Sequence, residues 1–191
     1  MANLIATLCF VSESAPLIYK SIQDHIRVHT NSGRLVLRAP LIRGPHARCM
    51  LIEKDLNEAI EQSSFARVSS VRMARLVRDL DRFSNGDRLG VVLDDRFENS
   101  CFMKRLSPST DEIWEIRSRD PQPGLRIFGR FAEQDVFVAV NMAIRKELDW
   151  EREKEVCESK WQLLFPSHPP ISGASINDYI SENVFDPSRI P

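Results

Sequence analysis

The chain has 191 residues, of which 42% are apolar and 28% are charged, and its formal net charge is −1. This length suits one domain with extensions, and the apolar fraction excludes a wholly disordered chain. No apolar run reaches the roughly 18 residues that a membrane-spanning helix needs. The apolar residues 4–11 are short for a signal peptide and have no basic segment before them. We therefore expect a cytoplasmic protein.

The cysteines and the basic residues add little by themselves. The cysteines are far apart and contain no CxxC pair, which is typical of reduced thiols in the cytosol: Cys9, Cys49, Cys101 and Cys157. Of the 26 basic residues, 20 are arginine and 6 are lysine. Arginine presents a planar fork of donors that suits carboxylate and phosphate, but a high genomic GC content produces the same bias. The balanced net charge argues against non-specific coating of nucleic acid.

The first 65 residues carry weak local signals. They predict a strand at 4–11, a helix from Ser14 to about His29, a strand at 34–38 and a helix at 51–62. A clearer helix follows at 66–83, where apolar side chains recur every three residues at Val68, Val71, Ala74, Val77, Leu80 and Phe83. The arginines between them are typical of a solvated face, with a phosphate-facing or partner-facing role as the alternative.

The hydrophobic period then changes from helix to strand. Short apolar segments predict strands at 89–93, 101–106, 112–119, 125–131 and 136–144. The turn sequence Asp120-Pro121-Gln122-Pro123-Gly124 and the other short connections favour an antiparallel meander of three or four strands. Residues 147–164 predict a charged amphipathic helix. The Pro- and Ser-rich residues 166–191 predict a mobile or wrapped tail.

The order of these segments carries a resemblance. The strings are FMKRL at 102–106, EIWEIRSRDPQPGLRIFGRF at 112–131 and VFVAVNMAIRKEL at 136–148, with a helix on either side. Together they resemble the RelE/ParE toxin superfamily, and within it the HigB-like and phage-derived branch. The resemblance covers about residues 66–165. Residues 1–65 then form an N-terminal extension, which we expect to pack on the core, and residues 166–191 form a tail.

The resemblance implies an α+β fold, with a curved antiparallel sheet of four to five strands and helices packed on one side. It also implies a toxin of a type II toxin–antitoxin system that cleaves mRNA on the ribosome without a metal or other cofactor. Its partners would be a cognate antitoxin protein and the ribosome with its mRNA, and no membrane. The oligomeric state stays open.

An alternative is a catalytically inactive interaction module on the same fold. Such toxins are usually short and strongly basic, whereas here 65 residues precede the matching segment. Residues 100–165 hold 11 Lys/Arg against 12 Asp/Glu. A protein partner could take the place of the antitoxin in such a module.

Cleavage of RNA without a metal needs a base, an acid and cations that stabilise charge on phosphorus. The resemblance favours as catalytic residues Lys104, Arg117, Arg126, Arg145 and Lys146. Further RNA-binding candidates are Arg105, Arg119, Arg130 and Trp114. The indole of Trp114 suits stacking on a base, whereas its apolar neighbours favour packing in the core. Because Glu115, Asp120 and Glu133 lie between these cations, ordinary cross-strand ion pairs are the competing interpretation. We predict no metal site.

Overall fold

A computed structural model describes residues 21–41, 44–62, 68–93 and 101–189 of the chain. The strand predicted at 4–11 and the start of the first predicted helix lie outside these residues. Within the described ranges, none of the helices combines the length and the apolar composition that crossing a membrane requires.

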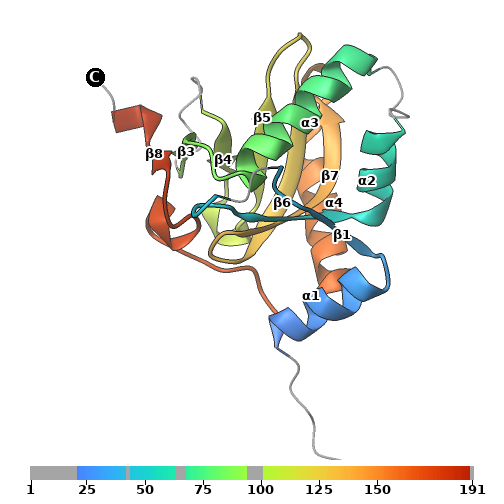
Figure 1. Cartoon of the computed structure of the whole chain (residues 1–191), viewed down its shortest axis with the longest axis vertical. Helices are drawn as coiled ribbons and strands as arrows, with labels where there is room; N and C mark the ends of the chain where they lie inside the picture. The colour runs from blue at the N-terminus through green and yellow to red at the C-terminus, as the bar shows by residue number, and fades with distance from the viewer. Residues whose placement is uncertain (1–20, 42–43, 63–67, 94–100, 190–191) are drawn as a thin grey trace, which may run out of the picture.

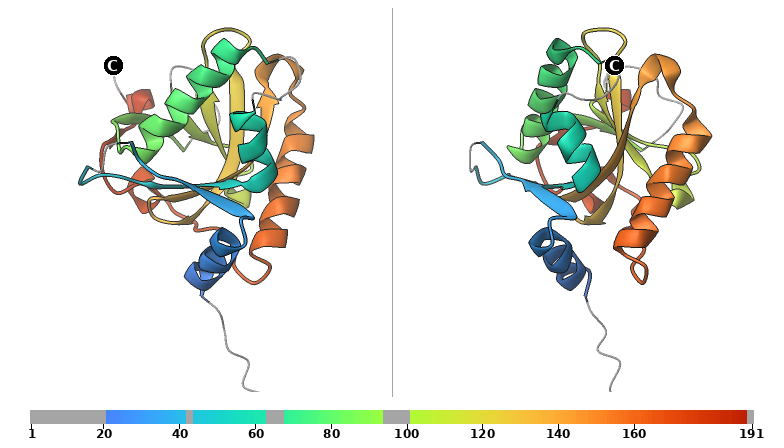
Figure 2. Two further views of the ribbon diagram at one scale, coloured as in Figure 1. Left: turned by 45° about the vertical axis from the view of Figure 1, so that its right-hand side comes forward. Right: turned by 90° about the vertical axis from the view of Figure 1, so that its right-hand side faces the viewer.

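Eight strands form one curled sheet in the order β1-β2-β7-β6-β5-β4-β3-β8 (Figures 1 and 2). The strands are β1 Leu35–Arg38, β2 Cys49–Glu53, β3 Leu89–Val92, β4 Met103–Arg105, β5 Trp114–Ser118, β6 Leu125–Glu133, β7 Val136–Ile144 and β8 Val184–Phe185. Strands β4 to β7 form an antiparallel meander, as the short connections predict. The pairs β2–β7, β3–β4 and β3–β8 are parallel, so the sheet is mixed.

The α+β sheet expected from the resemblance, with four to five antiparallel strands, is therefore wrong in strand number and direction. The additional strands come from parts of the chain without a counterpart in the resemblance. Strand β2 is apolar at Met50, Leu51 and Ile52, all of which are buried. Strand β2 lies between β1 and β7 and is therefore part of the sheet itself. The tail supplies β8 at the opposite edge.

Helices cover both faces of the sheet, whereas the resemblance implied one face (Figure 2). Helices α2 (Lys54–Glu61) and α3 (Ser70–Ser84) pack on one face, and α4 (Trp150–Leu164) packs on the other. Helix α1 (Ile22–Asn31) joins the second face through Ile22 and Ile26. Both faces of the central strands are consequently covered, and β6 and β7 are buried along nearly their whole length.

The side chains with which α3 packs against the sheet differ from the set that the spacing of three predicts. Its buried side chains include Met73, Leu76, Leu80 and Phe83, which follow the period of 3.6 residues. Val71, which belongs to the predicted stripe, has 65% of its surface exposed. An exact spacing of three drifts around a helix, so its members cannot all face the sheet.

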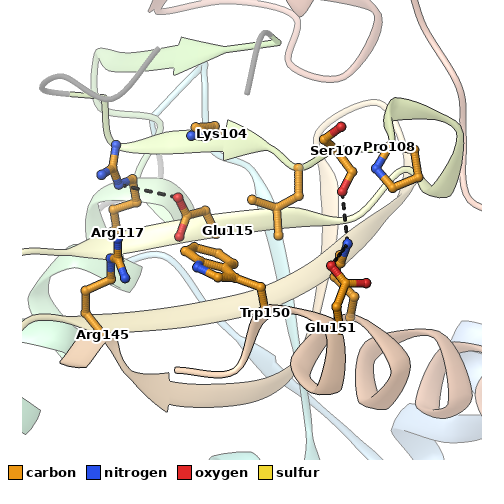
Figure 3. Close-up of a pocket in the computed structure, with 10 residues that line it drawn as sticks. Lys104, Ser107, Pro108, Glu115, Arg117, Arg145, Trp150 and Glu151 are labelled. Carbon is orange, nitrogen blue, oxygen red and sulfur yellow. Dashed lines mark hydrogen bonds and ion pairs between the residues drawn. The ribbon is translucent and has the colours of Figure 1, made fainter. Parts of the chain in front are cut away.

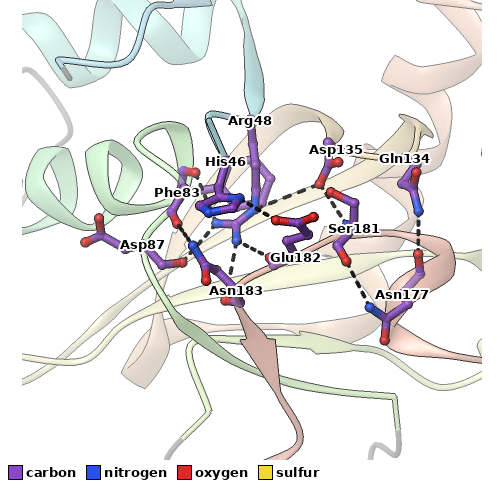
Figure 4. Close-up of polar contacts among 11 residues, drawn as sticks. His46, Arg48, Phe83, Asp87, Gln134, Asp135, Asn177, Ser181, Glu182 and Asn183 are labelled. Atoms are coloured by element: carbon purple, nitrogen blue, oxygen red, sulfur yellow. Dashed lines mark hydrogen bonds and ion pairs between the residues drawn. The ribbon is translucent and has the colours of Figure 1, made fainter. Parts of the chain in front are cut away.

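Arg48 joins the tail to the rest of the fold (Figure 4). Its side chain is 1% exposed and lies 3.9 Å from the carboxylate of Asp135. The guanidinium donates to the carbonyl oxygens of Asp87 at 3.1 Å and Glu182 at 2.7 Å. These contacts join the start of β2 to the loop that follows α3 and to the part of the tail that precedes β8.

We expect Arg48→Ala to lower the free energy of unfolding by about 3 kcal/mol, because it leaves several buried carbonyl groups and Asp135 without their charged donor. Urea unfolding followed by circular dichroism measures this change. Arg27→Ala is the control, since the Arg27 side chain is 72% exposed and, among the residues that the structure describes, pairs with Asp24 on its own helix. Equal stability of the two variants would show that Arg48 does not hold the tail.

Candidate active site

The meander brings four of the predicted cations to one place. Residues that lie opposite each other on antiparallel strands share a face of the sheet. Lys104 of β4 lies opposite Glu115 of β5, and Arg117 of β5 lies opposite Arg126 of β6. The side chains of Lys104, Glu115, Arg117 and Arg126 therefore belong to the face that α4 covers. Arg145 follows directly after β7, beside the start of α4.

A pocket of about 690 Å³ opens between this part of the sheet and the first turns of α4 (Figure 3). We call it the Glu115 pocket. The lining is Lys104, Leu106, Ser107, Pro108, Glu115, Arg117, Arg145, Trp150, Glu151 and Lys154. Four of these side chains are basic and two are acidic, so cations outnumber carboxylates on the wall.

Glu115 is the buried carboxylate of this pocket, with 1% of its surface exposed. Arg126 Nε lies 2.9 Å from Glu115 Oε2, and Arg117 Nε lies 3.5 Å from Oε1. Neither contact has hydrogen-bond geometry, and Oε2 accepts no hydrogen bond in the described structure. Burial raises the pKa of Glu115, while Arg126, Arg117, Lys104 and Arg145 act in the opposite direction. The carboxylate therefore keeps an acceptor oxygen and binds a proton more readily than an exposed glutamate.

The surrounding cations are held in fixed positions. Burial lowers the pKa of Arg126 to about 10 in spite of the neighbouring Glu115, so this guanidinium stays charged at neutral pH. Arg145 lies over the ring of Trp150 at 5.2 Å from its centroid, a cation–π contact. Lys154 donates to the carbonyl of Ser107 at 3.1 Å and contacts Glu151 at 2.7 Å. The pocket thus combines preorganised cations with one buried carboxylate.

Such a combination suits a phosphate group. Arginine donors bind phosphate oxygens in pairs, and preorganised cations stabilise negative charge that develops on phosphorus. A carboxylate with a raised pKa is suited to remove a proton near neutral pH. In the described ranges, no group of three His, Cys, Asp or Glu side chains is placed to hold a metal ion.

The other predicted RNA-binding residues lie elsewhere. Trp114 has no exposed surface and its ring contacts Phe131 and Tyr179, so it cannot stack on a base. Arg105 donates to the Tyr179 hydroxyl at 2.9 Å, on the face opposite α4. Arg119 lines a separate small hollow beside α3, and Arg130 lines a second pocket near the end of α4.

The structure separates Lys146 from the other predicted catalytic residues. It is exposed in the short 3-10 helix Arg145–Glu147 and does not line the Glu115 pocket. Sequence reasoning treated Glu115 only as an ion-pair partner, and it did not single out Lys154 as a pocket residue. The alternation of Glu115 and Arg117 with the apolar Trp114 and Ile116 was the signal that placed the two charges on one face.

Comparison with known proteins identifies no family. No protein-family model matches the chain, and neither a curated protein nor a solved structure is significantly similar to it.

We expect the stability of the wild type relative to Glu115→Gln to fall as the pH rises from about 4.5 to 8. The folded state raises the pKa of Glu115, so this group contributes stability below its unfolded pKa. That contribution is lost as the pH rises through the folded pKa. Glutamine cannot ionise and removes this dependence. Urea unfolding of both proteins over this range measures the difference; a difference that grows with pH would contradict the account.

Proposed function

We propose that the chain is a cytoplasmic, metal-independent endoribonuclease that binds a phosphodiester group of RNA in the Glu115 pocket. The observation that carries the proposal is the buried carboxylate of Glu115 beside two arginines, on a pocket wall where basic side chains outnumber acidic ones. The resemblance of residues 66–165 to mRNA-cleaving toxins points to the same substrate, although the sheet is larger than theirs.

The residues of the pocket supply each group that the reaction needs. Glu115 takes the proton from a ribose 2′-hydroxyl, and the 2′-oxygen attacks the adjacent phosphorus. Arg117 and Arg145 stabilise the negative charge on the phosphoryl oxygens, while Arg126, which does not line the pocket, lies against Glu115. The bond from phosphorus to the 5′-oxygen breaks, and this oxygen receives a proton from the ammonium group of Lys104 or Lys154. The products are a 2′,3′-cyclic phosphate and a 5′-hydroxyl end.

Trp150 and Ser107 would complete the substrate site. The Trp150 ring is held at the start of α4 by Arg145 on one side, and it contacts Phe128 at a ring separation of 6.1 Å. It is half-buried on the pocket wall, so its remaining surface can contact a base or a ribose. Ser107 also lines the pocket, and its hydroxyl would give a polar group of the nucleotide a hydrogen-bond partner.

We also propose a biological setting for this activity. Cleavage of mRNA on the ribosome, growth arrest and neutralisation by a cognate antitoxin are what the resemblance to HigB-like toxins suggests. A ribosome-dependent enzyme would cleave translated mRNA in a cell extract but leave free RNA intact. The cleavage assay therefore includes both substrates.

We expect the purified protein to cleave single-stranded RNA, or mRNA in a translating extract, in the presence of EDTA. Gel electrophoresis and mass spectrometry of the ends detect the cyclic phosphate. Glu115→Gln removes the base and lowers the rate by about 100-fold or more, and Arg145→Gln lowers it by about 10-fold or more. Lys146→Gln is the matched control, because the neighbouring cation lies outside the pocket and its loss leaves the rate unchanged.

The alternative is an interaction module without catalysis. It is favoured by the close contact of Arg126 with Glu115, since two buried charges that neutralise each other also serve as a purely structural pair. This alternative predicts no cleavage of either RNA substrate. It also predicts that Arg145→Gln weakens binding of a protein partner while leaving RNA unaffected.

A further inference from the structure

A second pocket, of about 470 Å³, lies along the later turns of α4 and shares no lining residue with the Glu115 pocket. We call it the Arg130 pocket. Arg130 of β6 forms part of its wall together with Glu158 and Trp161 of α4. The rest is formed by Thr110, Asp111 and Gln162 and by the segment 166–170 after the helix, which contains three prolines and His168.

Arg130 is a buried cation with few partners. It is 5% exposed, and its Nε atom has no hydrogen-bond partner. Within the described residues its charge is met by Glu158 alone, at 3.8 Å from Arg130 Nη2. The Glu158 side chain is 67% exposed, so it points largely toward solvent. A guanidinium always carries its charge and has five N–H donors, and a buried charge is costly unless acceptors surround it. The guanidinium of Arg130 therefore offers donors to an anionic ligand.

The charges around Arg130 limit which anion fits. The pocket wall holds Arg130 and His168 together with the carboxylates of Asp111 and Glu158. A dianionic phosphate or an RNA strand would be repelled by these two acids, whereas a single carboxylate matches the planar fork of one guanidinium. Trp161 and Pro166, Pro169 and Pro170 supply apolar surface beside the fork.

We propose that the Arg130 pocket binds a carboxylate group that is attached to an apolar moiety. Two sources share this chemistry: the carboxyl terminus of a peptide and a small carboxylic acid. In either case the carboxylate lies against the guanidinium of Arg130, and the apolar moiety lies against Trp161 and the prolines. The site is independent of RNA cleavage, because it uses other residues.

Isothermal titration of the full chain tests the proposal with four probes. N-acetyl-leucine represents a peptide terminus, and 4-methylpentanoate represents a small carboxylic acid with the same side chain. N-acetyl-leucinamide lacks the carboxylate, and inorganic phosphate replaces it. We expect at least one of the two carboxylates to bind, and the amide and phosphate to bind at least about 10-fold more weakly, the scale of a charge-assisted contact. The tighter of the two carboxylates identifies the source.

Three variants test the role of Arg130. Arg130→Gln abolishes carboxylate binding, and Arg130→Lys weakens it by about 10-fold, because lysine keeps the charge but loses the fork. Glu158→Gln removes the competing carboxylate and strengthens binding by about 3-fold. A structural ion pair would not produce this gain. Lys54→Gln on α2 is the control and leaves binding unchanged.

The proposal is overturned if no carboxylate binds, if the amide or phosphate binds as tightly, or if Glu158→Gln weakens binding. Should Arg130→Gln fail to fold, the lysine variant and Glu158→Gln decide the question. Loss of RNA cleavage by Glu115→Gln with carboxylate binding intact would show that the two sites act separately.

Discussion

A carboxylate and two guanidinium groups share a buried face of the central meander, and this burial of charge constrains the whole site. Glu115, Arg117 and Arg126 lie on strands whose other face is part of the core, and their own side chains are largely buried under α4. Their charges must be balanced locally. The arrangement is possible because α4 begins at Trp150 and leaves the pocket open beside them.

The local parts of the fold follow from the sequence, and the non-local parts do not. The turn at residues 120–124 and the alternation in 112–119 predict the meander that is observed. Strand β2 pairs with β7 across more than 80 residues, and β8 pairs with β3 at a similar distance. No spacing or turn signal specifies such pairings. The resemblance to a smaller sheet could not supply them either, and it misplaced the helices on one face.

In the candidate site, too, the local features could be predicted from the sequence and the non-local ones could not. Cross-strand register brings Lys104, Arg117 and Arg126 around Glu115, as a cluster of cations on neighbouring strands predicts. The burial of Trp114 and the position of Arg105 depend on Tyr179, which the tail carries into the core. Since that contact is non-local, strand alternation alone could not exclude either residue from the RNA-binding set. Helix α4 then divides the face into two pockets of different charge balance, one with an excess of cations and one in which Arg130 and His168 lie with two acids.

The central claim is that the Glu115 pocket binds a phosphodiester group. A crystal structure of the chain with a short RNA whose 2′-hydroxyl is replaced by hydrogen at each position tests it most directly, because such an analogue binds but cannot be cleaved. The account predicts a phosphate beside Arg117 and Arg145, with the 2′-carbon of the adjacent deoxyribose facing Glu115. Binding at another surface, or a pocket that stays empty at saturating RNA, would contradict it.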